Sequence, residues 1–287
     1  MKIITKILFI CAILILIVFV DSNDDENSNH DLSSNNNMLF AHRGLDEFAE
    51  NSWQGFKQSQ SLGFNSIECD VQFTKDNKLI IFHDKNAKRL LGIEKNIEDL
   101  MWSEIKAKTI IHNNEISEQY VLSLDELLRL SSNFQNLYLD FKTTNKTIAD
   151  SLLVLMEKYQ AYERLLIADA NILFLAYLKH KMPQIKTVLE GFNKGKEWTY
   201  YLIPSFLKPD YFASFFTEVD HKHLQFLNEQ NLMPRKVVYG INKSNFQQAV
   251  NMGFKHLIID YDSSLSLKVK DYKISNYLPH TDLKSHQ

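Results

Sequence analysis

Cysteine is scarce in this chain, since only Cys11 and Cys69 occur among its 287 residues. Cys11 lies in an apolar N-terminal run, so a processed chain would keep Cys69 alone and could form no internal disulfide. Cys69 alternates with Glu68 and Asp70 and is therefore expected to face a packed layer. We interpret it as a buried structural thiol rather than a nucleophile, because no neighbour in the sequence would lower its pKa.

An excess of positive charge is also lacking. The formal net charge is −3, and the isoelectric point is near 6.4. Proteins that bind nucleic acid through its backbone usually present a broad basic surface. The composition therefore argues against a nucleic-acid partner and favours a small phosphorylated substrate that is recognised locally. The oligomeric state is not predicted.

The N-terminal residues form a separate unit. Residues 1–22 contain an apolar run over 7–20 that two lysines precede. This run is shorter than the ~20 residues that usually span a bilayer, which favours a cleaved export signal over a short membrane anchor. Residues 23–37 are rich in Asn, Asp and Ser and are predicted to be a disordered linker. In either case residues 38–287 would be exported, as a secreted, periplasmic or membrane-anchored domain that can contact a membrane through the N-terminus.

Short β-rich runs alternate with amphipathic segments from Met38 onward, which is the pattern of parallel βα units. Eight strands are predicted, at 38–42, 66–73 with a continuation over 78–83, 137–142, 165–168, 186–190, 211–214, 237–241 and 256–260. Helices are predicted at 52–61, 124–130, 148–159, 172–181, 221–231 and 244–252. The segment 84–136 has room for only short helices, and no second folded domain is expected.

The positions of polar residues distinguish an open sheet from a closed barrel. Such residues follow the carboxyl ends of many different strands: His42, His83, Asp140, Lys142, Glu190, Asn242 and Asp260. This distribution fits a barrel mouth, where loops from all strands surround one site. An open sheet would instead gather its ligand groups at one switch point, usually beside a glycine-rich turn after the first strand. This chain has no such turn after its first predicted strand. We therefore predict an α/β protein with a single-domain (β/α)8 TIM barrel.

Acidic residues on two of these strands predict a metal site. Glu68 and Asp70 lie two residues apart, so their side chains point to the same face of one strand. Asp140 on the next long strand would add a third carboxylate, and three carboxylates suit Mg²⁺ or Ca²⁺. Acids on strands more often form exposed surface pairs. Here apolar residues alternate with the acids, so the strands are buried on their other face, and unpaired charges inside a barrel would be costly.

Histidine and basic residues beside these acids complete a candidate catalytic set. His42 and His83 stand at strand ends, where two imidazoles could take and give protons. Arg43 is suited to bind a phosphate through two hydrogen bonds, and Lys142 could add a point charge. A salt bridge to a neighbouring acid is the alternative interpretation for both. The aromatic segment 198–216 is open to three interpretations, which are a binding wall, core packing and a membrane-facing loop.

Taken in order, these residues resemble the signature of the glycerophosphodiester phosphodiesterase family. The matching pieces are His42-Arg43-Gly44, Glu50-Asn51, Glu68-Cys69-Asp70-Val71 and His83-Asp84. Each piece alone is weak, but the spaced and ordered set is specific, and the resemblance covers nearly everything after Met38. It implies a barrel enzyme that uses a divalent cation to cleave glycerophosphodiesters into sn-glycerol 3-phosphate and an alcohol.

The resemblance also implies roles for single residues. Glu68, Asp70 and Asp140 would be metal ligands, and His42 and His83 the acid–base pair. Arg43 would bind phosphate, with Lys142 beside it. Glu50 and Asn51 would support this set without touching the ion. The family usually has Glu where this chain has Asp140, and the shorter side chain can admit a water or change the metal preference.

Two other functions remain open at this point. The aromatic segment 198–216 and the export signal are compatible with a lysophospholipase D or sphingomyelinase-like enzyme that acts on acylated lipids. A catalytically silent barrel that binds a phosphorylated head group is the non-enzymatic alternative. The sequence also leaves open whether water or a hydroxyl of the substrate attacks the phosphorus.

Overall fold

The structure is a computed structural model, and it describes residues 37–265. The predicted export signal and nearly all of the predicted linker lie outside the described residues, as does the C-terminal segment 266–287. Among residues 37–265, no helix has the length and apolar character needed to cross a bilayer.

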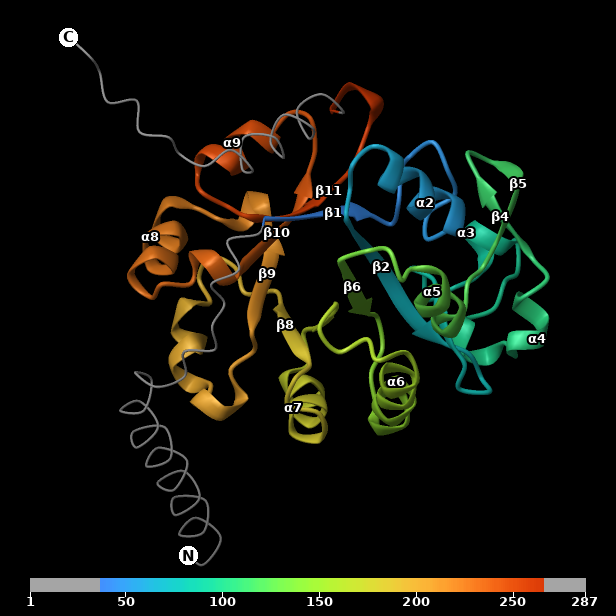
Figure 1. The fold of residues 1–287 in the computed structure, drawn as a ribbon, viewed down its shortest axis with the longest axis horizontal. Coiled ribbons are helices and arrows are strands. Elements are labelled where there is room, and N and C mark those ends of the chain that lie inside the picture. Colours follow the sequence, from blue (N-terminus) through green and yellow to red (C-terminus); the bar gives the residue numbers. More distant parts are fainter. Residues whose placement is uncertain (1–36, 266–287) are drawn as a thin grey trace, which may run out of the picture.

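Eight parallel strands close into a barrel (Figure 1). They are β1 (Met38–His42), β2 (Ser66–Phe73), β6 (Asn136–Phe141), β7 (Leu165–Asp169), β8 (Lys186–Glu190), β9 (Tyr211–Phe215), β10 (Lys236–Ile241) and β11 (His256–Ile259). Their order is β1-β11-β10-β9-β8-β7-β6-β2, and β1 also pairs with β2, which closes the ring. The predicted barrel is therefore confirmed, and every predicted barrel strand overlaps an observed one.

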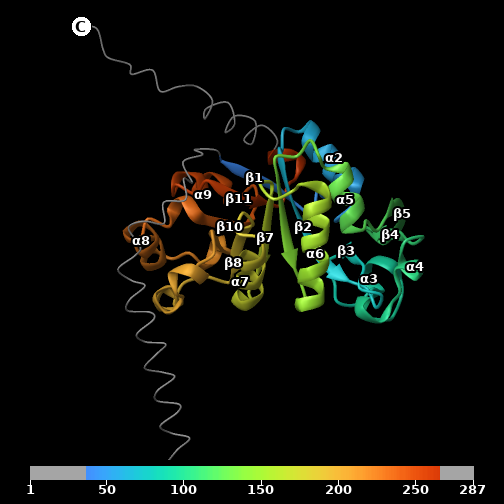
Figure 2. The ribbon, with the colours of Figure 1, turned by 60° about the horizontal axis from the view of Figure 1, so that its bottom comes forward.

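Helices cover the outside of the barrel (Figures 1 and 2). They are α2 (Trp53–Ser61), α5 (Leu124–Leu130), α6 (Lys146–Tyr159), α7 (Ile172–Lys181), α8 (His221–Glu229) and α9 (Phe246–Asn251). Local side chains fix where several of them begin. Ser52 accepts a hydrogen bond from the amide of Gly55, and Ser123 forms a capping box with Glu126. The polar residue before each of α2, α5, α6, α7 and α8 thus satisfies an amide group that the helix itself leaves free.

The connection from β8 to β9 contains no α-helix. Two 3₁₀ segments, η2 (Glu197–Leu202) and η3 (Ser205–Leu207), take its place. Further 3₁₀ turns are η4 (Phe216–Glu218), η5 (Met233–Arg235) and η6 (Ser263–Leu265). Part of the aromatic segment packs, because the ring of Tyr200 lies against the rings of Phe212 and Phe226.

The segment after β2 differs from the prediction in two ways. Strand β3 (Leu79–Ile81) runs antiparallel to β2, so it turns back instead of continuing that strand. The region beyond it holds the short helices α3 (Lys88–Leu91), η1 (Ile97–Asp99) and α4 (Trp102–Ile105), and also a hairpin of β4 (Thr109–His112) and β5 (Glu115–Tyr120). Both views place α3, α4 and the hairpin together at one edge of the barrel (Figures 1 and 2).

The prediction of short helices alone was wrong for this hairpin. Its tip is Asn113-Asn114, and both residues have positive φ, at 51° and 65°. Asparagine tolerates that conformation and is common in two-residue hairpin turns. The signal was therefore present at the tip, but β5 is largely exposed and shows little of the apolar alternation that marks a buried strand.

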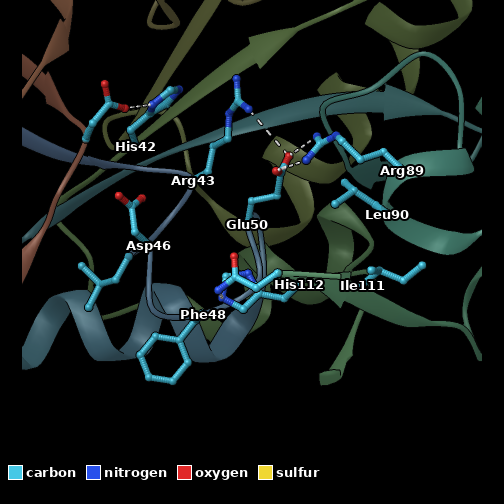
Figure 3. A pocket seen from close by; sticks show the side chains of 12 residues that line it. His42, Arg43, Asp46, Phe48, Glu50, Arg89, Leu90, Ile111 and His112 are labelled. Atoms are coloured by element: carbon cyan, nitrogen blue, oxygen red, sulfur yellow. Dashed lines mark hydrogen bonds and ion pairs between the residues drawn. The ribbon is translucent and has the colours of Figure 1, made fainter. Parts of the chain in front are cut away.

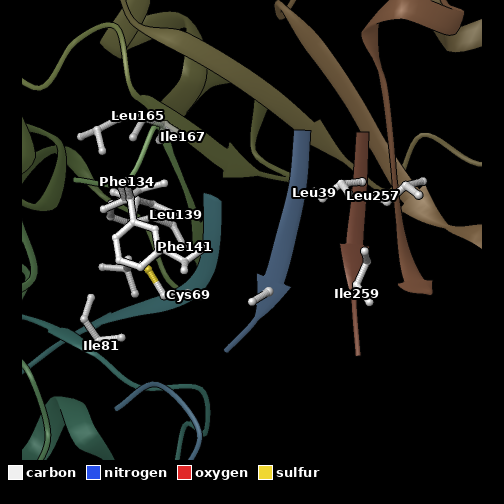
Figure 4. Packing of buried hydrophobic residues seen from close by; sticks show 14 of the residues in the cluster. Leu39, Cys69, Ile81, Phe134, Leu139, Phe141, Leu165, Ile167, Leu257 and Ile259 are labelled. Carbon is white, nitrogen blue, oxygen red and sulfur yellow. The ribbon is translucent and has the colours of Figure 1, made fainter. Parts of the chain in front are cut away.

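The strands have one packed layer on each side. Inward-facing side chains such as Phe40, Tyr138 and Val188 fill the interior of the barrel before the carboxyl ends of the strands. Outward-facing side chains pack against the helices, and Cys69 lies among them with Leu139 and Phe141 (Figure 4). Cys69 is fully buried, and burial raises the pKa of its thiol. The interpretation of Cys69 as a structural thiol is therefore confirmed.

Candidate active site

The inner face of the barrel becomes polar toward the carboxyl ends of the strands. Every second side chain of a strand points the same way. The residues two positions after the apolar inner layer are His42, Asp140, Glu190 and Asp260. The mouth of the barrel is therefore lined by acids and a histidine from strands that are far apart in the sequence.

Strand register brings the predicted acids together. Asp70 of β2 pairs directly with Asp140 of β6, and His42 of β1 pairs with Glu68 of β2. As a result, carboxylate oxygens of Glu68, Asp70 and Asp140 lie within 4.8 Å of one another. Three acids that the sequence places on two strands thus form one cluster.

Asp70 is the most heavily contacted of these acids. Lys142 Nζ lies 2.8 Å from its Oδ1, and Arg43 Nε lies 3.0 Å from its Oδ2. The side-chain amide of Asn51 donates a 2.8 Å hydrogen bond to the same Oδ2. Burial raises the pKa of Asp70, but Lys142 and Arg43 outweigh this effect, and the net pKa is lowered. Lys142 also pairs with Asp140, so the salt bridge weighed from the sequence is present.

Glu68 lies in the opposite electrostatic situation. It is buried, and burial together with the nearby charge of Asp70 raises the pKa of Glu68 to about 8. Its Oε2 accepts a 3.0 Å hydrogen bond from the backbone amide of Arg43 and lies 3.7 Å from His42 Nε2. The raised pKa shows that the cluster disfavours a third negative charge, so a bound cation would stabilise the ionised form of Glu68.

Each predicted catalytic histidine has a carboxylate on its Nδ1. Asp260 hydrogen-bonds His42 Nδ1, and Asp84 Oδ1 lies 2.8 Å from His83 Nδ1. Burial lowers the pKa of His42, but Glu68 and Asp260 raise it above its ordinary value. A carboxylate on Nδ1 fixes the ring and leaves Nε2 for proton transfer. Both rings therefore have the arrangement that acid–base chemistry needs.

A pocket of about 480 Å³ opens beside His42 (Figure 3). Its walls come from the loop between β1 and α2, from α3 and from the β4–β5 hairpin. They include Arg43, Asp46, Phe48, Glu50, Arg89, Ile111 and His112, and Asp260 also lines the pocket. The hairpin that the sequence did not reveal thus contributes a wall of the candidate site. None of the aromatic residues of segment 198–216 is among these lining residues.

The comparison with protein families decides which family this is. The model of the glycerophosphoryl diester phosphodiesterase family matches residues 42–262, which span both histidines and all three clustered acids. The chain belongs to this family. The resemblance inferred from the motifs is therefore confirmed.

Individual relatives are distant. A glycerophosphodiester phosphodiesterase of Bacillus altitudinis is 26% identical over 156 residues, which are 52% of this chain and 64% of that protein. The match thus spans less than two thirds of the relative. A lysophospholipase D of Homo sapiens is 36% identical over 66 residues, which are 23% of this chain and 21% of that protein. A phosphodiesterase of Oleispira antarctica, solved with the product sn-glycerol-3-phosphate, is 19% identical with a TM-score of 0.70 over 83% of this chain and 99% of that chain.

The acidic cluster fits the divalent cation that the family implies. Its donors are all carboxylate oxygens, which hard cations such as Mg²⁺ and Ca²⁺ prefer. Asp70 Oδ1 is buried, and its one charged contact, with Lys142 Nζ at 2.8 Å, lacks hydrogen-bond geometry, so this oxygen could also coordinate a metal. Glu68 and Asp70 are buried, and Asp140 is partly buried. We therefore regard Glu68, Asp70 and Asp140 as residues able to hold the ion.

The structure also places the remaining predicted residues. Asn51 bonds Asp70 as described, while Glu50 bonds Arg89 and lies 3.6 Å from Arg43. Asn242 does not enter the site, because its side-chain oxygen accepts a hydrogen bond from Ser244 in a local turn. Arg89 is not among the site residues predicted from the sequence, although it lies in the wall of the site. Its position after the His83-Asp84 motif was the one available signal.

Proposed function

We propose that this chain hydrolyses glycerophosphodiesters to sn-glycerol 3-phosphate and an alcohol, with a divalent cation. The observation that carries the proposal is the meeting of His42, Arg43 and the three acids at one barrel mouth. A phosphodiester needs positive charge for its anionic oxygens and two proton carriers for the attacking and leaving groups. The site offers positive charge from Arg43 and Lys142, and it offers His42 and His83 as the proton carriers.

A divalent cation held by Glu68, Asp70 and Asp140 would polarise the phosphate and orient the glycerol hydroxyls. Arg43 and Lys142 supply positive charge beside that position, so both can bind phosphate oxygens once the substrate enters. Both side chains already contact Asp70, at 3.0 and 2.8 Å. These salt bridges are compatible with the proposed role in phosphate binding, because Asp70 holds both basic side chains at the mouth of the barrel.

We propose separate tasks for the two histidines, because they line different hollows. The pocket is lined by His42, while His83 lines a second hollow with Asp84 and Arg89. We assign the departing alcohol to the pocket, so His42 donates the proton to its oxygen. His83 takes the proton from the attacking hydroxyl as its new bond to phosphorus forms. If water attacks, glycerol 3-phosphate results directly, and if a glycerol hydroxyl attacks, a water must afterwards open the cyclic phosphate to give the same product. Asp260 and Asp84 hold the two rings through Nδ1 during both transfers.

A second candidate substrate is a lysolipid. Trp198, Tyr201, Leu202 and Phe206 are each more than half exposed on η2 and η3, and such apolar groups suit contact with acyl chains or a lipid surface. The human relative named lysophospholipase D supports the same class.

We also propose that residues 38–287 are exported, and finding the chain in a cytoplasmic fraction would contradict this proposal.

The test measures release of choline by the purified full chain, because both substrates below lose choline when the phosphodiester is cleaved, and glycerol 3-phosphate is assayed as the second product of the unacylated substrate. Glycerophosphocholine and lysophosphatidylcholine are offered separately, with Mg²⁺ or Ca²⁺ and then with excess chelator. We expect turnover of the first substrate, loss of turnover with chelator, and a fall of about 10² or more in His42→Gln and His83→Gln. His221→Gln, at the exposed start of α8, is the matched control and should keep full activity.

Three results would reject the proposal or redirect it. Full turnover after complete metal removal would exclude the assigned role of the acids. Wild-type activity in His42→Gln would remove the assigned proton donor. Turnover of the lysolipid alone would move the function to the second candidate.

A further inference from the structure

Arg89 has an unusually complete set of partners for a surface residue. It lies on the short helix α3, and its side chain is 51% exposed. Its Nη1 and Nη2 donate hydrogen bonds of 2.6 and 2.9 Å to the two oxygens of Glu50. Its Nε and Nη2 donate bonds of 2.7 and 2.8 Å to the two oxygens of Asp84. One guanidinium thus holds two carboxylates, each through both oxygens, as the dashed lines for Glu50 show in Figure 3.

One of these carboxylates leads to His83. Asp84 Oδ1 accepts from Arg89 and also lies 2.8 Å from His83 Nδ1. The backbone at this point is fixed as well, because the side-chain amide of Gln72 donates to the carbonyls of His83 and Asp84, at 3.0 and 2.7 Å. With the backbone held by β2, the orientation of the His83 ring depends on Asp84, and that of Asp84 depends on Arg89.

The other carboxylate leads to Arg43. Glu50 Oε1 lies 3.6 Å from Arg43 Nη1, while Arg43 Nε lies 3.0 Å from Asp70. Both Glu50 oxygens already accept from Arg89. Because Arg89 occupies them, Glu50 is kept from forming a full two-point pair with Arg43, and the Arg43 guanidinium stays available to a phosphate.

We propose that Arg89 is a positioning residue that controls both sides of the reaction centre, holding His83 through Asp84 and keeping Arg43 free through Glu50. It also acts as the cation of a second cluster. Donor atoms of Glu50, His83 and Asp84 lie within 4.8 Å of one another, and Arg89 bonds the two acids. A protein cation in that place makes a second metal ion unnecessary. The kinetic part of this inference rests on the proposed function.

The kinetic experiment compares Arg89→Met with Lys88→Met. Lys88 is the neighbouring residue of α3, borders the same hollow and pairs with Glu94 at 2.9 Å, so its removal changes the local charge equally without touching Glu50 or Asp84. For Arg89→Met we expect kcat to fall about tenfold, because His83 loses its fixed orientation. KM should rise about tenfold, because freed Glu50 competes with the phosphate for Arg43. Lys88→Met should leave both constants unchanged.

Two further variants separate positioning from general damage. Arg89→Lys keeps the charge but not the forked geometry, so its kcat should fall between those of the wild type and Arg89→Met. The double variant Arg89→Met with Glu50→Gln removes the competing carboxylate, and it should restore KM while kcat stays low. Equal kcat and KM in Arg89→Met and Lys88→Met, or a KM that Glu50→Gln does not restore, would overturn the inference.

A binding measurement tests the inference without turnover. Titration of each purified, metal-free full chain with Mn²⁺ by calorimetry gives the number of ions bound per chain. Arg89→Met should bind one Mn²⁺ more than Lys88→Met, because Glu50, His83 and Asp84 then lack their cation. Equal stoichiometry would overturn the inference. If no diester is hydrolysed, the proposed function fails, and this titration still decides whether Arg89 serves as the cation of the cluster.

Discussion

Replacing Gly44 by alanine should damage the site more than its small size suggests. Gly44 follows His42 and Arg43, and its φ of +99° is one that residues with a Cβ rarely adopt. A Cβ at this position would lie 3.0 Å from the carbonyl carbon and 3.2 Å from the Cα of Gly55 in α2. The loop that carries both site residues therefore passes directly against the helix backbone, and neither side can yield without moving the other.

The cost of Gly44→Ala has two parts. The unfavourable φ contributes about 1–2 kcal/mol to the loss of unfolding free energy. The contact with the backbone of α2 adds about 1–3 kcal/mol, as for other overpacked sites. Gly195→Ala is the matched control, because Gly195 also has a positive φ, +82°, but no atom lies within 4 Å of the added Cβ. It should show the first cost alone.

Chemical unfolding followed by circular dichroism measures both variants. We expect Gly44→Ala to lose about 1–3 kcal/mol more than Gly195→Ala. Its proposed diesterase activity should also fall at temperatures where the fold is intact, because the steric overlap with α2 is relieved when the loop that carries His42 and Arg43 moves away. Equal destabilisation of the two variants would refute the close approach between the loop and α2.

Two buried bases should make stability depend on pH. Burial lowers the pKa of His256 from 6.5 to about 4, so the unfolded chain binds the proton first, and the free energy of unfolding should fall by about 2 kcal/mol between pH 6.5 and 5. Urea titrations should show a shallower fall in His256→Gln, and an unchanged slope would contradict the assignment. Burial likewise lowers the pKa of Lys236 to about 7, while Glu190 and Glu218 partly oppose this, and its Nζ donates to the carbonyl of Phe192. Stability should therefore rise from pH 7 to 9 in the wild type and rise less in Lys236→Met, and equal rises would count against a neutral buried lysine.

Much of the fold could be predicted because buried parallel strands give clear local signals. The bounds of β1, β2, β8, α5 and α7 agree with the prediction. The alternation of side chains along β2 correctly predicted that Glu68 and Asp70 share one face of the strand and that Cys69 lies on the other, because successive residues of a strand point to opposite faces. The clustering of the acids then followed from strand register alone.

The parts that failed depend on contacts between distant segments. Arg89 and Glu50 are 39 residues apart, and nothing local in either stretch indicates that they meet. The hairpin β4–β5 is held by packing of Ile110 against a small separate core rather than by a strong strand pattern. The connection over η2 and η3 has aromatic residues at helical spacing, yet tertiary contacts with Phe212 and Phe226 decide its shape.

The pairing of β1 with both β2 and β11 has a consequence for how the protein matures. His42 and Asp260 are 218 residues apart, and they meet only after the last strand has docked beside the first. An incompletely synthesised or partly folded polypeptide therefore lacks this dyad however well its earlier helices have formed. Only molecules in which β1 and β11 have paired can therefore hold His42 and Asp260 together, and incompletely folded chains lack this part of the site.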